Sequence, residues 1–293
     1  MKRNIWGLNL QELETWVVGN GFPRFRAKQL RDYLYKRHIF HFDEMTQFSQ
    51  KMRDWLKENG QIDKPVIISR AQSDDEKTIK LLLKLKDGSL VETVCMCHHY
   101  GNSICVSTQV GCAMGCIFCA STRKGLERNL TAGEILAQMY AFKELYDIPF
   151  HSIVLMGAGE PLTNYEEVLH FIHRANDPEL LNISYRNITI STCGIVPQIY
   201  RLADENIPIT LAISLHAPND RIRNVLVPIS KNFRIKDVVS AAEYYFKKTK
   251  RRVTFEYILI KDMNASVENA KELCRLIGKM PCHINLIPIN GTE

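Results

Sequence analysis

The 293-residue chain has no apolar run near the roughly 20 residues needed to cross a bilayer, and its first residues lack the apolar core of a signal peptide. It also has no internal repeats and no low-complexity segment. Apolar residues make up 45% and charged residues 24% of the chain, as in an ordinary globular protein. We therefore expect a cytoplasmic protein with one sizeable α/β domain and a smaller appendage.

The cysteine content does not fit a secreted disulfide framework. The chain has nine cysteines, an odd number, and three of them fall in the stretch 112–120, which reads C-A-M-G-C-I-F-C-A. Reduced thiols used for metal or redox chemistry explain this distribution better than paired disulfides do.

The three clustered cysteines, Cys112, Cys116 and Cys119, have C-x3-C-x2-C spacing, with Gly115 between the first two. Three thiolates on one loop do not complete a tetrahedral zinc site, and they leave one iron of a [4Fe-4S] cluster without a protein ligand. An iron with a vacant position can bind a substrate or cofactor. The motif therefore predicts a [4Fe-4S] cluster with one open iron.

Two other interpretations of these cysteines stay open. A zinc site could take its fourth ligand from His98, His99 or Cys105. The cysteines could also be buried thiols without a metal. Zinc motifs usually present two pairs of ligands, whereas this chain has one group, so the iron–sulfur interpretation is favoured.

Positive charge is concentrated near the N-terminus. The net charge is +6, and residues 22–38 contain six cations and a single anion, Asp32. The cations are Arg24, Arg26, Lys28, Arg31, Lys36 and Arg37. Such a stretch is typical of a surface that contacts phosphates, although a solvated helix face is the more common explanation.

Hydrophobic periodicity divides the chain into three regions. Residues 1–60 read as a small helical domain with one of its helices over 43–56, and residues 61–100 as a β-rich connector. From residue 101 onward, strands and helices alternate. Strands are predicted at 103–108, 152–156, 187–191, 210–214, 252–259 and 282–288. Regular alternation with apolar strands indicates parallel pairing, and six units indicate a partial (β/α)6 barrel over 101–293.

Polar or metal-binding groups follow five of the six predicted strands. They are the cysteine loop, Gly159-Glu160, Ser191-Thr192, Ser214-Leu215-His216 and Asn290. Because chemistry in such folds lies at the carboxyl ends of the strands, we expect these groups at one rim. An amino-acid ligand could chelate the open iron there, with Glu160 holding its ammonium group. Reductive cleavage of S-adenosylmethionine (SAM) at such a site would yield a carbon radical.

The chain resembles the RlmN/Cfr family of radical SAM RNA methyltransferases, which act on adenosine in 23S rRNA. The matching segments are Q-V-G-C-A-M-G-C-I-F-C-A, R-N-L-T-A-G-E-I, M-G-A-G-E-P-L, A-I-S-L-H-A-P-N-D, V-P-I and I-N-L-I-P-I-N. Pro161 in G-E-P-L is similar to the RlmN branch, which modifies C2 of adenine, whereas the Cfr branch modifies C8. The resemblance implies a partial (β/α)6 barrel with a small N-terminal helical domain that helps to grip RNA.

The resemblance also implies the reaction and its partners. It predicts methylation of C2 of an adenosine in 23S rRNA, and of adenosine 37 in some tRNAs, through a 5'-deoxyadenosyl radical generated with a [4Fe-4S] cluster and SAM. An electron donor such as flavodoxin or ferredoxin is expected, with a cytoplasmic location, no membrane partner and a monomeric state.

Residue roles follow from the matching motifs. The resemblance assigns the cluster to Cys112, Cys116 and Cys119, and SAM to Gly159, Glu160, Ser191, Ser214, Leu215, His216 and Asn290. It makes Glu92 a proton acceptor and Cys105 the thiol that resolves a protein–RNA adduct. From the residues alone, Glu92 is an ordinary strand carboxylate and Cys105 a buried core thiol.

One family feature has no counterpart in residues 1–293. The family carries the methyl group on a cysteine in an I-D-A-A-C-G-Q-like segment, and no such segment occurs here. We expect residues 1–293 to bind the cluster and SAM without completing RNA methylation. Two alternatives from other classes are a zinc-containing RNA-binding module and a radical SAM enzyme with another substrate, such as a protein.

Overall fold

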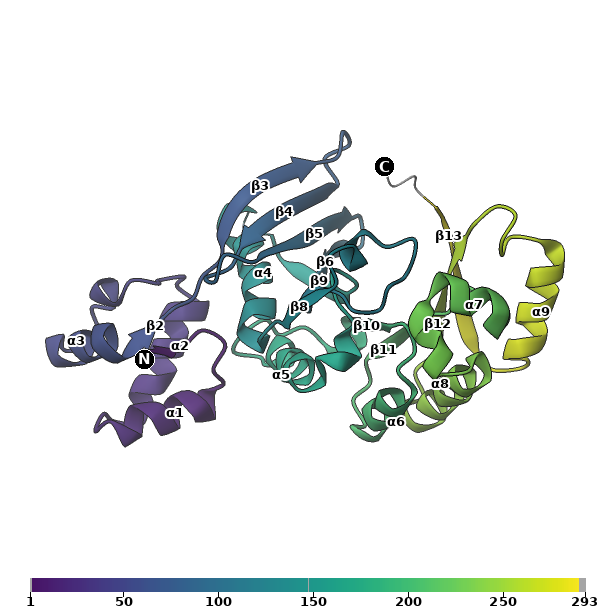
Figure 1. Cartoon of the computed structure of the whole chain (residues 1–293). Helices are drawn as coiled ribbons and strands as arrows, with labels where there is room; N and C mark the ends of the chain where they lie inside the picture. Colours follow the sequence, from purple (N-terminus) through teal and green to yellow (C-terminus); the bar gives the residue numbers. More distant parts are fainter. Residues whose placement is uncertain (1, 147, 290–293) are drawn as a thin grey trace.

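The computed structural model describes residues 2–146 and 148–289 (Figure 1). Its N-terminal part is helical and lies at one end of the molecule. The elements are β1 (Arg3–Asn4), α1 (Leu10–Gly19), α2 (Phe25–Tyr35), the 3-10 turn η1 (Phe42–Glu44), α3 (Gln50–Asn59) and β2 (Gly60–Gln61). Strands β1 and β2 pair in parallel and so join the two ends of this part.

The helix predicted over 43–56 is wrong at its start, because α3 begins at Gln50. Residues Phe42–Glu44 form a 3-10 turn instead. The hydroxyl of Ser49 accepts a hydrogen bond from the backbone N–H of Met52 at 3.4 Å, which marks Ser49 as the N-cap. The serine was the sequence signal for this boundary.

One nine-stranded sheet forms the centre of the molecule, in the order β13-β12-β11-β10-β9-β6-β5-β4-β3. The parallel strands are β6 (Gly101–Cys105), β9 (Phe150–Leu155), β10 (Ile188–Thr192), β11 (Thr210–Ser214), β12 (Val253–Leu259) and β13 (Cys282–Pro288). Strands β5 (Leu90–His98), β4 (Thr78–Lys84) and β3 (Val66–Gln72) continue the sheet beyond β6, and each runs antiparallel to the strand before it in the sheet. The six parallel strands predicted from the sequence are confirmed.

Helices connect the parallel strands. They are α4 (Ala132–Tyr146), α5 (Tyr165–Asn176), α6 (Val196–Asp204), α8 (Ile235–Thr249) and α9 (Val267–Ile277). The short helix α7 (Asp220–Leu226) was not predicted; the side chain of Asn219 caps it by accepting the N–H of Ile222 at 3.0 Å. None of the helices within residues 2–146 and 148–289 is long and apolar enough to cross a membrane.

The sheet core and the helical part share one continuous set of buried side chains. Ile104, Ile153 and Leu211 are fully buried on the parallel strands. The indole of Trp6 reaches from the helical part to donate a hydrogen bond to the carbonyl of Gly133 at 3.0 Å. The two parts are therefore packed together rather than joined by a loose linker.

Candidate functional site

A cavity of ≈ 270 Å³ opens at the carboxyl ends of the parallel strands, and we call it the cysteine cavity. Its walls come from the loop that follows β6 and from the ends of β9, β10 and β11. Of the residues predicted from the sequence, it is lined by Cys112, Cys116, Cys119, Gly159, Glu160, Ser191, Ser214 and His216. The strand-end argument therefore brings these side chains together.

Leu215, a further predicted residue, does not line the cavity. Leu215 is fully buried, and its backbone N–H donates to the carbonyl of Glu256 at 3.1 Å, so its side chain belongs to the core. Asn290 lies outside the described residues.

The cysteine loop is framed by a two-stranded antiparallel ribbon, β7 (Gln109–Gly111) and β8 (Leu126–Asn129). The backbone N–H of Cys112 donates to the carbonyl of Gly125 at 2.9 Å, which closes the loop at its base. Gly111 has φ +74°, and a Cβ at this position would collide with the carbonyl oxygen of Gly125. Glycine is therefore required where the two ends of the loop meet.

Glu160 is 3% exposed, and backbone donors hold its carboxylate. One oxygen accepts the N–H of Leu162 at 3.0 Å and the other accepts the N–H of Cys193 at 2.7 Å. Burial raises the pKa of Glu160, while these donors act in the opposite direction. Gly159 has φ +109°, and a Cβ there would lie 2.7 Å from the Cβ of Gln109. The cavity wall is thus tightly built at this turn.

Comparisons with known proteins agree over nearly the whole chain. Residues 106–274 match the model of the radical SAM superfamily, and residues 3–62 match that of the ribosomal RNA large subunit methyltransferase N-terminal domain. A "Probable dual-specificity RNA methyltransferase RlmN" of Clostridium novyi is 49% identical over 289 residues, covering 98% of this chain and 84% of the relative. The chain belongs to the RlmN family of radical SAM RNA methyltransferases.

A second relative and a crystal structure support the same family. The RlmN of Staphylococcus saprophyticus is 46% identical, covering 99% of this chain and 80% of that protein. A crystal structure of a radical SAM methyltransferase from Sphaerobacter thermophilus superposes with a TM-score of 0.94 at 42% identity, covering 99% of this chain and 86% of that one. The expected fold and enzyme class are confirmed, and family membership sets the zinc-module alternative aside.

Radical SAM enzymes of this kind use a [4Fe-4S] cluster and SAM, and the donor set of the cysteine cavity fits them. Burial raises the pKa of Cys116 to about 12, and negative charge on Cys119 and Cys112 adds to this effect. The thiolates therefore need a positively charged metal group before they can coexist in this pocket. Among residues 2–146 and 148–289, no three His, Cys, Asp or Glu side chains are grouped to hold a single metal ion.

A fourth thiol in this RlmN-family cavity, that of Cys193, was missed by sequence reasoning. It comes directly after β10, which was the available signal. Burial raises the pKa of Cys193 well above its usual value, and the negative charge of Glu160 adds to the effect. Cys193 follows a different strand, whereas the other three thiols share one short loop, so the three loop cysteines remain the favoured donor set.

His216 forms a neutral wall of the cavity. Its Nδ1 accepts the backbone N–H of Ile258 at 3.1 Å, and its ring meets Phe118 edge-on with centroids 4.8 Å apart. Burial lowers the pKa of His216 to about 3, and the charge on Arg223 contributes. The backbone has φ +57°, a conformation held by the side chain of Asn264, which donates to the His216 carbonyl at 2.8 Å.

A second cavity of ≈ 830 Å³ adjoins the first, and we call it the outer cavity. The two share Cys119, Met156 and Gly157 as lining residues. The outer cavity is lined by both predicted catalytic residues, Glu92 on β5 and Cys105 on β6. The sequence-predicted site is therefore divided between two neighbouring spaces.

The two catalytic candidates differ in their surroundings. The carboxylate of Glu92 is 56% exposed and pairs with Lys80 across the β4–β5 ladder at 3.0 Å. Burial raises the pKa of Cys105 to about 11, so its thiol is protonated near neutral pH. Glu92 thus faces solvent, and Cys105 lies in the cavity floor.

The basic N-terminal stretch is partly structural. Arg31 is 5% exposed and forms a two-pronged hydrogen-bonded pair with Asp177 at 3.0 and 3.1 Å. Lys36 binds Glu179 at 2.6 Å. Both partners lie just after α5, so these cations attach the helical part to the barrel. The interpretation as a phosphate-contacting surface is wrong for Arg31.

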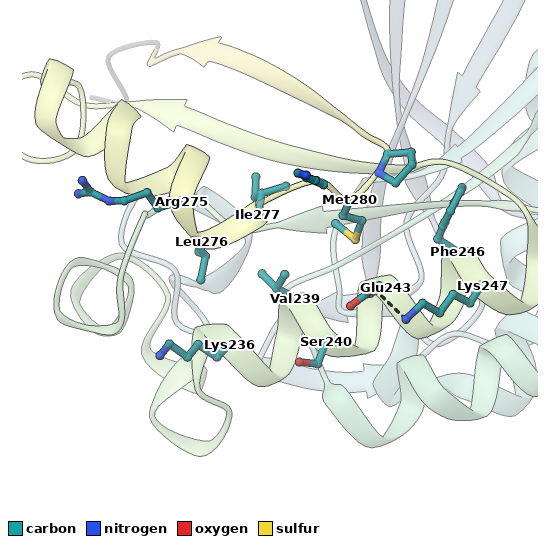
Figure 2. A pocket seen from close by; sticks show the side chains of 12 residues that line it. Lys236, Val239, Ser240, Glu243, Phe246, Lys247, Arg275, Leu276, Ile277 and Met280 are labelled. Atoms are coloured by element: carbon teal, nitrogen blue, oxygen red, sulfur yellow. Dashed lines mark ion pairs between the residues drawn. The ribbon is translucent and has the colours of Figure 1, made fainter.

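A separate groove of ≈ 650 Å³ lies between α8 and α9 (Figure 2). Figure 2 shows Glu243 and Lys247 paired along α8, at 2.8 Å, with Arg275 on the neighbouring α9. The groove contains none of the residues predicted for the site. The groove is therefore separate from the site that the sequence predicts.

Proposed function

We propose that this protein methylates C2 of an adenosine in 23S rRNA and of adenosines in some tRNAs, with Cys112, Cys116 and Cys119 as cluster ligands. One observation carries the proposal: the cysteine cavity, lined by the three loop thiols and Glu160, adjoins an outer cavity lined by Glu92 and Cys105. The relatives are named dual-specificity RNA methyltransferases, which supports two RNA substrates.

In this proposal the chain binds and orients the cofactor. Ser191 and Ser214 offer hydroxyl groups, Glu160 offers a carboxylate for the ammonium group of SAM, and His216 forms an uncharged wall. When bound, the cluster supplies the electron that cleaves SAM and produces the carbon radical. The residues of the cavity exclude water and orient SAM, so that the radical forms at a fixed position.

The outer cavity receives the target adenine. An adenine must leave its stack before its C2 edge is accessible, and a space of ≈ 830 Å³ beside the cysteine cavity can take it. In this proposal Glu92 accepts the proton from C2, and Cys105 resolves the covalent adduct. Arg123 and Lys124 also line this cavity and offer positive charge to RNA phosphates.

The cofactor steps can be tested on residues 1–293. After anaerobic reconstitution, the wild type should bind iron and sulfide as a [4Fe-4S] cluster and form 5'-deoxyadenosine from SAM on reduction. Cys116→Ala should lose both properties, while Cys274→Ala, an exposed cysteine on α9, should retain them. Zinc in place of iron, or iron without SAM cleavage, would refute the proposal.

The methyl-transfer step needs a cysteine that the resemblance places outside residues 1–293. We expect no 2-methyladenosine in RNA incubated with residues 1–293, SAM and reductant. With a segment carrying that cysteine supplied, methylation should appear in the wild type. It should be absent in Glu92→Gln even though SAM is still cleaved. RNA digested to nucleosides and analysed by mass spectrometry distinguishes these results.

RNA binding is tested by its salt dependence. Replacing a phosphate-contacting cation should weaken binding to all RNA sequences alike and reduce the salt slope by about 1. Lys124→Ala is the test, and Lys271→Ala, an exposed lysine on α9, is the matched control. Equal affinities for the two variants across a salt series would remove Lys124 from the RNA interface.

A further inference from the structure

A fully buried arginine, Arg223, lies beneath the cysteine cavity. It belongs to α7 and has 0% exposure. Its Nη2 donates to the carbonyls of Cys193 at 2.5 Å and Ser214 at 3.4 Å, and its Nε donates to the carbonyl of Leu215 at 3.3 Å. One guanidinium therefore ties together the carboxyl ends of β10 and β11, from which the cavity is built.

The remaining nitrogen of this guanidinium is unsatisfied. Nη1 of Arg223 is buried and has no hydrogen-bond partner in the described part of the chain. None of the ion pairs formed by the described residues involves Arg223. Arginine is not deprotonated in proteins, and buried charges are otherwise paired or bound to a metal group. The charge therefore calls for an anionic partner.

The cysteine loop packs directly on the helix that carries this charge. The backbone N–H of Ile117 donates to the carbonyl of Leu226, the last residue of α7, at 3.2 Å. Cys116 packs against a buried cluster that includes Cys112, Cys193 and Leu226. The negative charges that act on Arg223 come from Cys193, from Asp220 on the same helix and from Cys116. Of these, Cys116 lies on the loop that would hold the cluster, so bound metal would bring further negative charge to this guanidinium.

We propose that Arg223 is the buried counter-charge of the iron–sulfur cluster and raises its reduction potential. The proposal rests on ligation of the cluster by Cys112, Cys116 and Cys119. A cluster held by three thiolates becomes more negative by one charge when it accepts an electron. Net charge, hydrogen bonds and burial set the potential of such clusters, and a fixed positive charge at low dielectric favours the reduced form.

Arg223 also supports the strand ends, so its charge must be separated from its hydrogen bonds. Arg223→Lys keeps the positive charge but loses the planar fork that reaches several carbonyls. Arg223→Gln keeps an amide donor and loses the charge. A purely structural role predicts similar behaviour of both variants, whereas a counter-charge role predicts that only the Gln variant shifts the potential.

The experiment is a redox titration of reconstituted protein, followed by electron paramagnetic resonance, for the wild type and both variants. Arg223→Gln should lower the equilibrium constant for reduction of the cluster at least tenfold, which corresponds to a fall of about 59 mV in the reduction potential of a one-electron couple. Arg223→Lys should stay within a few-fold of the wild type. Tyr245→Phe, which removes a buried neutral hydrogen bond to the Ile209 carbonyl outside both cavities, is the control and should leave the potential unchanged.

Several outcomes would overturn the proposal. An unchanged potential in Arg223→Gln is one, and an equal fall in the Lys and Gln variants is another. If the Gln variant does not fold, Arg223→Met replaces it. If neither folds, the Lys variant decides: a tenfold lower equilibrium constant for reduction of the cluster in Arg223→Lys contradicts the proposal, and a value near that of the wild type supports it. Failure of the wild type to take up iron and sulfide would instead refute the proposed function.

Discussion

His216 illustrates how single residues in this site are held in one charge state. Its Nδ1 is occupied by a backbone N–H, its ring is buried against Phe118, and its pKa falls to about 3. Cys105 shows the same effect for a thiol, because burial raises its pKa to about 11. Desolvation is the first cause in both cases, so both side chains are neutral at neutral pH.

The buried histidine predicts a specific acid sensitivity of the metal-free protein. His216 has a pKa near 6.5 when unfolded and about 3 when folded, so below pH 6.5 only the unfolded chain gains this proton. The free energy of unfolding should fall by about 1.4 kcal/mol from this residue between pH 7.5 and 5.5. His216→Gln should remove that part of the pH dependence in urea unfolding.

The control for this prediction is His98→Gln, at the exposed end of β5, which should keep the wild-type pH dependence. If the free energy of unfolding still fell by the wild-type amount between pH 7.5 and 5.5 in His216→Gln, the imidazole of His216 would have the same pKa in the folded and unfolded chain.

At the scale of elements, the cysteine loop depends on the β7–β8 ribbon, and two glycines test this. Gly111 and Gly125 have nearly equal angles, φ +74° and φ +73°, but an added Cβ collides only at Gly111. Gly125→Ala should cost about 1–2 kcal/mol from the left-handed backbone alone. Gly111→Ala should cost more and reduce iron uptake several-fold, because the loop base must open.

Urea unfolding and iron per chain, measured on both alanine variants, check this prediction. If the Gly111 variant matched the Gly125 variant in both measurements, the close approach of the two loop ends would have no role in metal uptake.

The elements also show why sequence reasoning succeeded for the barrel and failed elsewhere. Apolar strands alternating with helices predicted all six parallel strands, because each repeats a pattern over many residues. The ribbon strands β7 and β8 span 3 and 4 residues and α7 spans 7, too short for periodicity to show. Most of the cavity residues could be predicted because they directly follow predicted strands, and parallel strands end at one rim.

Other site residues depended on contacts that the sequence does not record. Glu256 lines the cysteine cavity from β12, and its buried carboxylate accepts a hydrogen bond from Asn285 at 2.8 Å. Its only signal was a charge within an apolar strand. Arg223 is 0% exposed, yet arginine is mostly a surface residue. Its burial arises from the docking of α7 onto two strand ends, which no local pattern reveals.

At the scale of the whole molecule, the N-terminal helical part is fixed to the barrel at closely packed points. The backbone of Gly7 approaches Gly133 on α4 so closely that a Cβ at either position would collide. Arg31 reaches Asp177 beyond α5. These contacts fix the orientation of the helical part relative to the two cavities.

The buried Arg31–Asp177 ion pair should contribute to the stability of the folded chain. Asp177→Ala leaves a guanidinium with 6% side-chain exposure without its carboxylate, so the free energy of unfolding should fall by about 1–3 kcal/mol. Glu179→Ala, which removes the exposed partner of Lys36, should leave the free energy of unfolding almost unchanged, because solvent screens this pair. Adding Arg31→Met to Asp177→Ala should recover part of the loss, because the unpaired charge is gone. Urea unfolding of the wild type, the two single variants and the double variant measures these free energies. A double variant less stable than Asp177→Ala would mean that Arg31 contributes through packing rather than through its charge.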